Sequence, residues 1–292
     1  MSPHTATRES VGDMPNPLGL QGIEFIEYHT AKPQTLGQSL ERLGFRPVAR
    51  HRSREVMLYR QGDMNIIVNA HRSPDEPPLP EWATIAAVAF RVQDAARAYK
   101  RVLDLGAWAV PTQVAVMELN IPAIHGVGSS LIYFVDRVGE FSIYDVDFVP
   151  IPTVDPRPPA LAGLHLFGLV QYIGFDRIDD WMAFWGELFG FADLPPGHSF
   201  GVLPQGRILA SPCGTLYWQL IEPVPDAADV DTEELLQRVA FGTADVLASV
   251  QALKARGVEF VESKVGVHSE ARGALTRPSD QGPTFELVLD PR

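Results

Sequence analysis

The stretch Val88–Val110, VAFRVQDAARAYKRVLDLGAWAV, lies without a gap over Val239–Val261, VAFGTADVLASVQALKARGVEFV. Each copy reads as an apolar strand, an aspartate that caps a helix, a helix with apolar residues at intervals of three and four, a glycine and a second strand. This repeat predicts that the same strand–helix–strand module occurs once in each half of the chain. The capping residues are Asp94 and Asp245, and the glycines are Gly106 and Gly257.

A second pair of segments supports the same duplication. Leu36–Val48, LGQSLERLGFRPV, is similar to Met182–Leu194, MAFWGELFGFADL, and each reads as a helix that ends in Leu-Gly-Phe or Phe-Gly-Phe. A βαβββ module is too small to bury its sheet face alone, so two modules must curl together. We therefore predict an α+β fold of two domains, each made of two βαβββ modules that form an open cupped barrel. A ligand is expected on the concave side.

Short β-rich runs and a proline-rich segment complete the plan. Five prolines in Val149–Ala160, VPIPTVDPRPPA, favour an extended connector. We predict a flexible tail at 1–20, a structural N-terminal domain at 21–150, a Pro-rich linker at 151–160 and a C-terminal ligand-binding domain at 161–292. The predicted strands besides the repeat are Val56–Tyr59, Asn65–Asn69, Ser130–Val135, Ile143–Val149, Arg207–Ala210, Leu216–Ile221 and Phe285–Leu289.

The composition excludes several classes of protein. With 46% hydrophobic and 21% charged residues, the chain is typical of a folded globular protein. The formal net charge of −12 disfavours nucleic acid as a partner, because phosphate binding needs clustered cations. We see no signal peptide or membrane segment, and the single cysteine, Cys213, can form no internal disulfide. We therefore predict a cytoplasmic protein without a nucleic-acid or membrane partner.

Long ordered strings carry a more specific signal. In the first half they include GIEFIEY at Gly22–Tyr28, HRSREVMLYRQGDMNIIVNA at His51–Ala70 and MELNIPAIHGVG at Met117–Gly128. Weaker matches follow at Trp181–Phe191 and Thr284–Val288. These strings resemble the 4-hydroxyphenylpyruvate dioxygenase family of the vicinal oxygen chelate superfamily. The resemblance implies the two-domain fold, a structural first half and an active site in the second.

The resembled family holds Fe(II) in its second half through two histidines and one carboxylate, which leaves open positions for a 2-oxo acid and dioxygen. The resemblance places Gly168 at the first histidine, or Leu169 after a shift of one residue, and Arg238 at the second. Arginine is a permanent cation that does not bind metal. The third ligand is kept as Glu286. We therefore expect a degenerate metal site and no bound cofactor, although Fe(II) is the cofactor of the family.

Arg238 and Glu286 are the candidate catalytic residues. The resemblance implies that both project from neighbouring strands into one cavity, where the guanidinium replaces the positive charge of the metal. Arg238 would then bind a ligand carboxylate and Glu286 would act as a general base. The alternative is an inert ion pair that fills a dead site. The expected substrate-binding residues are Gln237, Arg238, Phe285, Trp218 and Ile221.

Three functions remain open. The first is a metal-independent lyase, isomerase or hydrolase that acts on a small aromatic or 2-oxo acid. The second is an iron-dependent dioxygenase with a relocated site, built from Glu286, His165, His198 and His268, since imidazole and carboxylate suit iron. The third is a metal-free small-molecule binding protein. A homo-oligomer, as in the resembled family, is a further expectation because exposed sheet edges can pair.

Overall fold

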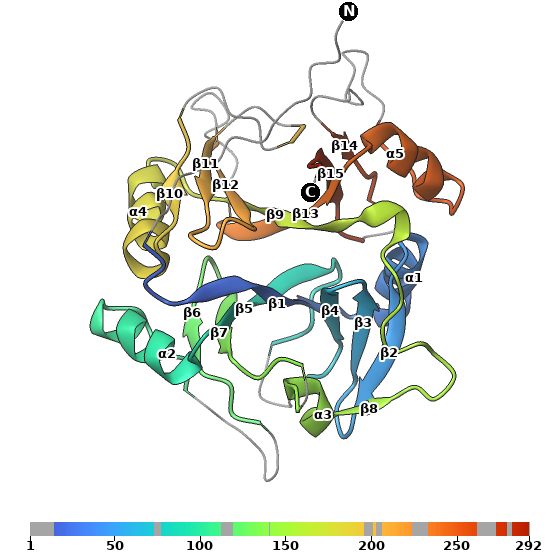
Figure 1. Cartoon of the computed structure of the whole chain (residues 1–292), viewed down its shortest axis with the longest axis horizontal. Helices are drawn as coiled ribbons and strands as arrows, with labels where there is room; N and C mark the ends of the chain where they lie inside the picture. Colours follow the sequence, from blue (N-terminus) through green and yellow to red (C-terminus); the bar gives the residue numbers. More distant parts are fainter. Residues whose placement is uncertain are drawn as a thin grey trace, which may run out of the picture.

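Two mixed sheets with flanking helices form the computed structural model (Figure 1). The larger sheet has the strand order β6-β7-β5-β1-β4-β3-β2-β8, and the smaller has the order β10-β11-β12-β9-β13-β15-β14. This arrangement confirms the predicted α+β class. The structure describes residues 15–72, 77–111, 119–139, 141–195, 201–202, 206–223, 233–261, 273–278 and 282–291.

The N-terminal sheet contains the first eight strands. They are β1 (Leu20–His29), β2 (Arg46–His51), β3 (Val56–Gln61), β4 (Met64–Asn69), β5 (Thr84–Val92), β6 (Ala123–His125), β7 (Leu131–Val135) and β8 (Phe148–Pro150). The helices of this half are α1 (Pro33–Arg42), α2 (Ala95–Asp104) and α3 (Ile143–Asp147).

The C-terminal sheet repeats the pattern with seven strands in the described part of the chain. They are β9 (His165–Tyr172), β10 (Ala192–Asp193), β11 (Arg207–Ala210), β12 (Tyr217–Ile221), β13 (Leu235–Thr243), β14 (Ala274–Leu275) and β15 (Phe285–Leu289). The helical segments are the 3-10 turn η1 (Leu161–Gly163), α4 (Ile178–Ala183), the π-helical turn η2 (Phe184–Leu188) and α5 (Val246–Lys254).

The duplicated helices begin and end as the sequence predicts. The side chains of Asp94 and Asp245 each accept a hydrogen bond, 2.9 Å long, from the backbone N–H three residues further on. Gly106 and Gly257 follow the helices with φ angles of 95° and 84°, in the left-handed region that glycine adopts without strain.

A β-bulge occurs at the same place in both domains. In β1 one extra residue, Glu24, stands opposite the step Ala89–Phe90 of β5. In β9 one extra residue, Phe167, stands opposite the step Ala240–Phe241 of β13. A bulge re-aims the inserted side chain, and here it turns both residues toward the concave face of their sheet. The register therefore gives an internal alignment of the two domains, residue by residue.

The two sheets pack back to back. Strand β13 lies against β5 (Figure 1), and the largest apolar cluster joins side chains from both domains. At its centre Phe90 contacts the rings of Trp185, Phe189, Phe191 and Trp218. Two smaller clusters lie on the opposite face of each sheet. The concave sides of the two domains are consequently turned away from each other.

One predicted strand is wrong. The run Ile143–Val149 indicates a strand by its apolar residues, whereas the structure forms helix α3 there and begins β8 only at Phe148. Ser142 starts the helix with a capping box, in which its side chain accepts from the backbone N–H of Asp145 and its backbone N–H donates to Oδ2 of Asp145 at 2.8 Å. Its hydroxyl also donates to the same Oδ2 at 2.9 Å. In so short a run this local capping interaction outweighs β-propensity. The helix turns Tyr144 into the N-terminal concave side.

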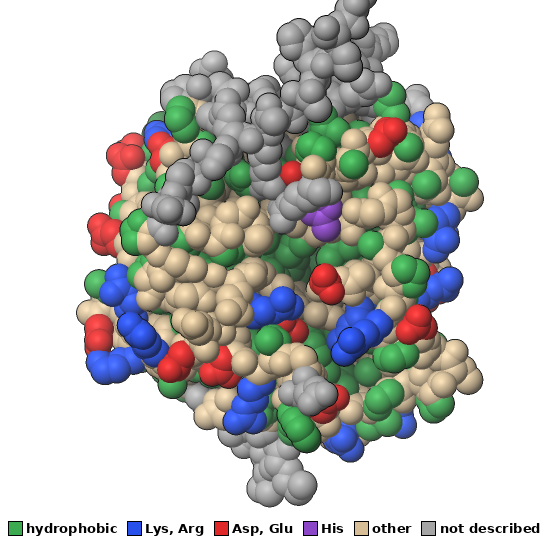
Figure 2. Space-filling model, viewed as in Figure 1, with side chains coloured by type: hydrophobic (Ala, Val, Ile, Leu, Met, Phe, Trp, Pro, Cys, Tyr) green, Lys and Arg blue, Asp and Glu red, His purple; other side chains and the backbone are tan. Residues whose placement is uncertain are grey.

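The surface gives two further facts. Within the described segments, no helix is both long and apolar enough to cross a lipid bilayer. Figure 2 shows basic and acidic side chains interspersed on one face, above all over the N-terminal domain in the lower half of the view. This face therefore has a mixed pattern of charge.

Candidate functional site

Strands β13 and β15 bring Arg238 and Glu286 together on the concave face of the C-terminal sheet. Nε of Arg238 donates to Oε2 of Glu286 at 2.7 Å, and the two side chains are 3% and 0% exposed. Their neighbours Val239 and Leu287 point into the core between the sheets. Because side chains alternate along a strand, Arg238 and Glu286 must face the other way, into the cup.

Both partners make further hydrogen bonds. Nη1 of Arg238 donates to Oε1 of Gln237 at 2.8 Å. The backbone N–H of Val202 donates to Oε1 of Glu286, and Gly201 lies so close that a Cβ there would overlap the same oxygen. Among the described residues, no group accepts a hydrogen bond from the buried Nη2 of Arg238. A buried donor without a partner costs about 1–3 kcal/mol, so an oxygen atom of a ligand would be stabilised there.

Strand β12 supplies the other side of the cup. Ile221 packs against the concave apolar cluster, in which the rings of Phe167 and Tyr217 are stacked 4.9 Å apart. Gln219 lies between these residues on the same face and is 1% exposed. Sequence reasoning missed Gln219, although a glutamine that alternates with apolar residues in a strand is a signal of a buried amide. The cup is thus lined mainly by apolar side chains, with the polar groups of Gln219, Arg238 and Glu286 along one side.

Trp218 and Phe285 lie on the opposite face, in the core. Nε1 of Trp218 donates to Oε1 of Gln171 at 2.8 Å, and the ring of Phe285 stacks on Phe241 with centroids 5.6 Å apart. Both residues belong to the cluster between the two sheets. Because they directly adjoin cup-facing residues along their strands, they cannot share that face. Their assignment to the substrate pocket is therefore corrected, and Ile221 is the apolar candidate that the structure places in the cup.

The described residues do not fit the Fe(II) site of the family. Gly168 pairs with Ala240, which in turn pairs with Glu286, whereas Leu169 points into the core. Of the two residues that the resemblance offers for the first ligand position, Gly168 is therefore the one that shares a face with Glu286. A glycine and an arginine supply no metal ligand, and the guanidinium already binds the carboxylate that remains. A facial triad needs two histidines and a carboxylate on one face, and these three positions do not supply them.

His165 pairs with Asp290, whereas the relocated metal site would require it beside Glu286. Its Nε2 lies 2.8 Å from Oδ2 of Asp290, near the end of the sheet. No group of three His, Cys, Asp or Glu side chains in the described segments could hold a metal ion. His198 and His268 lie outside the described residues, so a relocated iron site that includes them stays a prediction.

Known proteins share this fold and much of this sequence. Residues 14–149 match the family described as hydroxyphenylpyruvate dioxygenase, HPPD, N-terminal. A 4-hydroxyphenylpyruvate dioxygenase of a Pseudomonas species is 36% identical over 306 residues, which cover 94% of this chain and 85% of that protein. The chain belongs to the 4-hydroxyphenylpyruvate dioxygenase family.

Other relatives in the comparison carry different names. Hemolysin VllY of Vibrio vulnificus is 36% identical over 286 residues, covering 88% of this chain and 79% of the relative. A 3-dehydroshikimate dehydratase of Pseudomonas aeruginosa is 31% identical over 289 residues, covering 92% of this chain but 44% of that protein. Membership of the family therefore does not fix one activity.

Two solved structures show the same fold over almost the whole chain. A fusion protein of a xylose isomerase-like TIM barrel and 4-hydroxyphenylpyruvate dioxygenase superposes with a TM-score of 0.73 at 24% identity, covering 97% of this chain and 52% of that one. A mutant of 4-hydroxymandelate synthase from Streptomyces coelicolor superposes with a TM-score of 0.69 at 17% identity, covering 93% of each chain. At these identities the likeness concerns the fold, and it confirms the paired βαβββ architecture.

Proposed function

We propose that this protein is a divergent enzyme of the family that acts on a small aromatic or 2-oxo acid by proton transfer, without the family's Fe(II) site. The observation that supports the proposal is the buried pair of Arg238 and Glu286, in which one guanidinium nitrogen still lacks an acceptor among the described residues. A buried cation beside a carboxylate in a largely apolar cup suits lyase, isomerase or hydrolase chemistry that begins with the removal of a proton.

Arg238 anchors the ligand in this proposal. Its Nη2 donates to a carboxylate or carbonyl oxygen of the ligand, since a charge-assisted hydrogen bond is strong in a buried site. The ring of an aromatic acid packs beside Phe167 and Ile221, which line the cup. The amide of Gln237, which is held by Nη1 of Arg238, fixes the plane of the guanidinium.

Glu286 is the general base. Each of its oxygens accepts one hydrogen bond, from Arg238 or from Val202, and retains a second lone pair for a proton. The carboxylate takes the proton from C3 of a 2-oxo acid, the C–H electron pair forms the C=C bond, and the negative charge moves to the carbonyl oxygen beside Arg238. Return of the proton to that oxygen gives the enol. Alternatively, a leaving group departs from C4 with its electron pair, a C3=C4 bond forms, and the reaction is an elimination.

Deuterium exchange tests the proposal directly. The chelator-treated protein is incubated in D₂O with phenylpyruvate, and loss of the C3 proton signal is followed by NMR against buffer alone. We expect Glu286→Gln to abolish the enzymatic exchange and Arg238→Ala to weaken binding tenfold or more. Glu259→Gln, at a carboxylate that is 75% exposed, is the matched control and should exchange at the wild-type rate. Binding without exchange would identify a binding protein and refute the enzyme.

Metal content is the second test. We expect no stoichiometric Fe, Zn or Mn in the purified wild-type protein by elemental analysis. Arg238→His should not restore iron binding, because Gly168 still supplies no second imidazole. About one equivalent of metal in the wild-type protein, together with product formation only in its presence, would favour the dioxygenase with a relocated site and overturn the metal-free proposal.

A further inference from the structure

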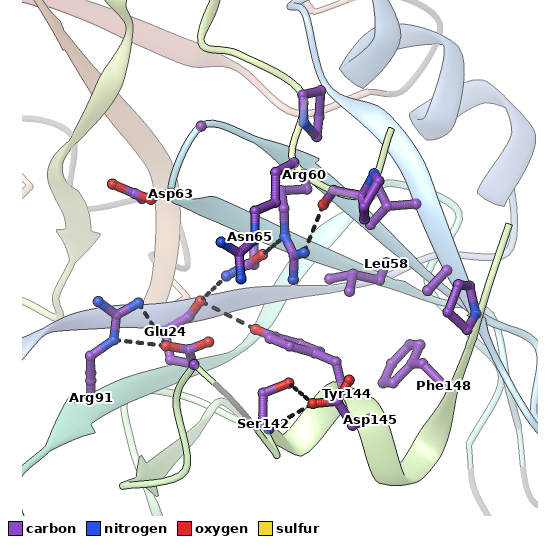
Figure 3. Close-up of a pocket in the computed structure, with 18 of the residues that line it drawn as sticks. Glu24, Leu58, Arg60, Asp63, Asn65, Arg91, Ser142, Tyr144, Asp145 and Phe148 are labelled. Carbon is purple, nitrogen blue, oxygen red and sulfur yellow. Dashed lines mark hydrogen bonds and ion pairs between the residues drawn. The ribbon is translucent and has the colours of Figure 1, made fainter. Parts of the chain in front are cut away.

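The geometry points to a second ligand site, in the concave face of the N-terminal sheet, for a small hydroxylated aromatic carboxylate. A cavity of about 860 Å³ lies between this face, helix α3 and the proline-rich segment that follows β8 (Figure 3). Its volume is within the range of small-molecule sites. The cavity is separate from the cup of Arg238 and Glu286, because the two concave faces are turned away from each other.

The N-terminal cup is not a copy of the C-terminal one. The internal alignment places Phe25 and Tyr133 at the positions of Gly168 and Glu286, and their rings lie 5.9 Å apart. This aromatic contact occupies the place of Glu286, and Ala87 stands where the second domain has Arg238, so the charged pair has no counterpart here. In the N-terminal cup the polar groups lie further along the strands, at the bulge residue Glu24.

A buried ion pair forms the floor of the cavity. Glu24 is 4% exposed, and its Oε2 accepts hydrogen bonds from Nε and Nη2 of Arg91 at 2.8 and 2.7 Å. Figure 3 shows the carboxylate between Arg91 and helix α3, facing the interior of the cavity. Both bonds from Arg91 go to one oxygen, so Oε1 keeps lone pairs that can accept a hydrogen bond from a ligand hydroxyl.

Arg60 on strand β3 stands across the cavity from this pair. Its Nε donates to Oδ1 of Asn65 at 2.7 Å, its Nη1 donates to the carbonyl of Pro156 at 2.8 Å, and its guanidinium carbon lies 5.3 Å from the centre of the Tyr144 ring. These three contacts hold the guanidinium plane in one orientation. Nη2 has no acceptor within the described segments, and it is available to a carboxylate.

The charge and the shape of the lining select the ligand. Four arginines and three carboxylates line the cavity, in a chain whose formal net charge is −12, so the cavity is locally positive and favours an anion. Leu58, Tyr144 and Phe148 form an apolar wall on one side of the cavity, beside Arg60 and Glu24 (Figure 3). Burial, followed by the charge of Glu24, raises the pKa of Tyr144 well above its ordinary value, so its hydroxyl stays neutral.

A planar acid with a hydroxyl group satisfies all three features. Its carboxylate lies on Arg60, its ring against the apolar wall, and its hydroxyl donates to Glu24. A free phosphate has no ring for the wall, and benzoate has no hydroxyl for the carboxylate. We assign the site to ligands of the size and polarity of 4-hydroxybenzoate.

Fluorine NMR of the full chain isolates this site from the C-terminal cup. A 4-fluorophenylalanine incorporated at Phe148 reports on the cavity wall while 4-hydroxybenzoate is titrated. We expect a saturable shift of this resonance, a Kd raised tenfold or more by Arg60→Met, and a similarly weaker response to benzoate. Arg46→Met is the matched control, since Arg46 is exposed and lies opposite Arg60 on the neighbouring strand β2. It should change the Kd less than twofold.

The outcomes separate the two sites. A titration shift that Arg60→Met removes and Arg238→Ala leaves intact supports the N-terminal site, whatever the exchange activity of the protein. An unshifted resonance at millimolar 4-hydroxybenzoate overturns the N-terminal site. This measurement uses the fluorinated but otherwise wild-type chain, so it does not depend on a substitution that could unfold the protein. Equal effects of Arg46→Met and Arg60→Met would also overturn the N-terminal site. Neither result bears on the proton transfer assigned to Glu286.

Discussion

Removal of Arg238 is expected to destabilise the whole protein, because it leaves Glu286 as a buried carboxylate without its cation. The two side chains are 3% and 0% exposed and their charged atoms are 2.7 Å apart. Loss of one partner from such a buried pair costs about 3–5 kcal/mol. We therefore expect Arg238→Met, which keeps an apolar side chain of similar length, to lower the free energy of unfolding by that amount. This is a large part of the roughly 5–15 kcal/mol that stabilises a typical domain.

A double-mutant cycle measures the coupling energy between Arg238 and Glu286. At an effective dielectric constant of about 20, the direct attraction over 2.7 Å is about 6 kcal/mol, most of which is offset by the desolvation of both groups. Arg238→Met and Glu286→Gln together leave no unpaired charge, so the double variant should cost less than the sum of the single variants. We expect a coupling energy of about 2–3 kcal/mol, at the upper end of the range for contacting residues.

Urea unfolding followed by the fluorescence of the buried tryptophans gives the four free energies. The exposed pair Lys100–Asp104, whose side chains are 75% and 63% exposed, provides a matched control cycle with Lys100→Met and Asp104→Asn. Its coupling energy should be about 0.5 kcal/mol or less. A buried coupling no larger than this control, or an unchanged stability of Arg238→Met, would refute the reasoning on Arg238 and Glu286.

Three further predictions concern other parts of the structure. Gly201→Ala should cost about 1–3 kcal/mol in urea unfolding and reduce C3 exchange, because the new Cβ overlaps Oε1 of Glu286; wild-type values for both would contradict this contact. Burial raises the pKa of Tyr28 above its ordinary value of about 10, so the unfolded chain loses this proton first and stability falls as the pH rises above 10. Tyr28→Phe should reduce that slope by up to about 1.4 kcal/mol per pH unit, and an identical slope between pH 9 and 11 would rule the idea out. Ser142→Ala should cost about 0.5–2 kcal/mol by thermal or urea unfolding, since it removes the hydroxyl of the capping box with Asp145; no loss would mean that α3 does not depend on its cap.

The capped helix of the repeated module was predictable because its signals are local, whereas the second strand predicted after each glycine is only an isolated bridge, at Ala109 and at Phe260. An aspartate before a helical pattern and a glycine after it act within a few residues, and both copies of the module carry them. The strand assignments Arg207–Ala210 and Phe285–Leu289 are confirmed for the same reason, since apolar runs between turns extend over short stretches. The run Ile143–Val149 failed because a capping box and an apolar run compete there, and sequence periodicity does not weigh one against the other.

The candidate site was predictable only in part. The resemblance to the family indicated Arg238 and Glu286 as a pair, and the structure brings their charged atoms together. It also indicated Trp218 and Phe285, although plain alternation along β12 and β15 places both on the face opposite Ile221 and Glu286. A bulge hid Glu24, whose carboxylate enters the N-terminal cup only because β1 carries an extra residue.

The sequence by itself thus determined the duplicated helices and the family, and its resemblance to the family indicated Gly168 or Leu169, Arg238 and Glu286 at the three ligand positions. These features reside in residue types and in short-range spacing. Only the tertiary structure decided that the backbone of Val202 donates to Glu286, that Arg60 faces the pair of Glu24 and Arg91 across a cavity, and that the two cups open in opposite directions. Such contacts join strands and loops that are distant along the chain, and their geometry arises when the two sheets pack back to back.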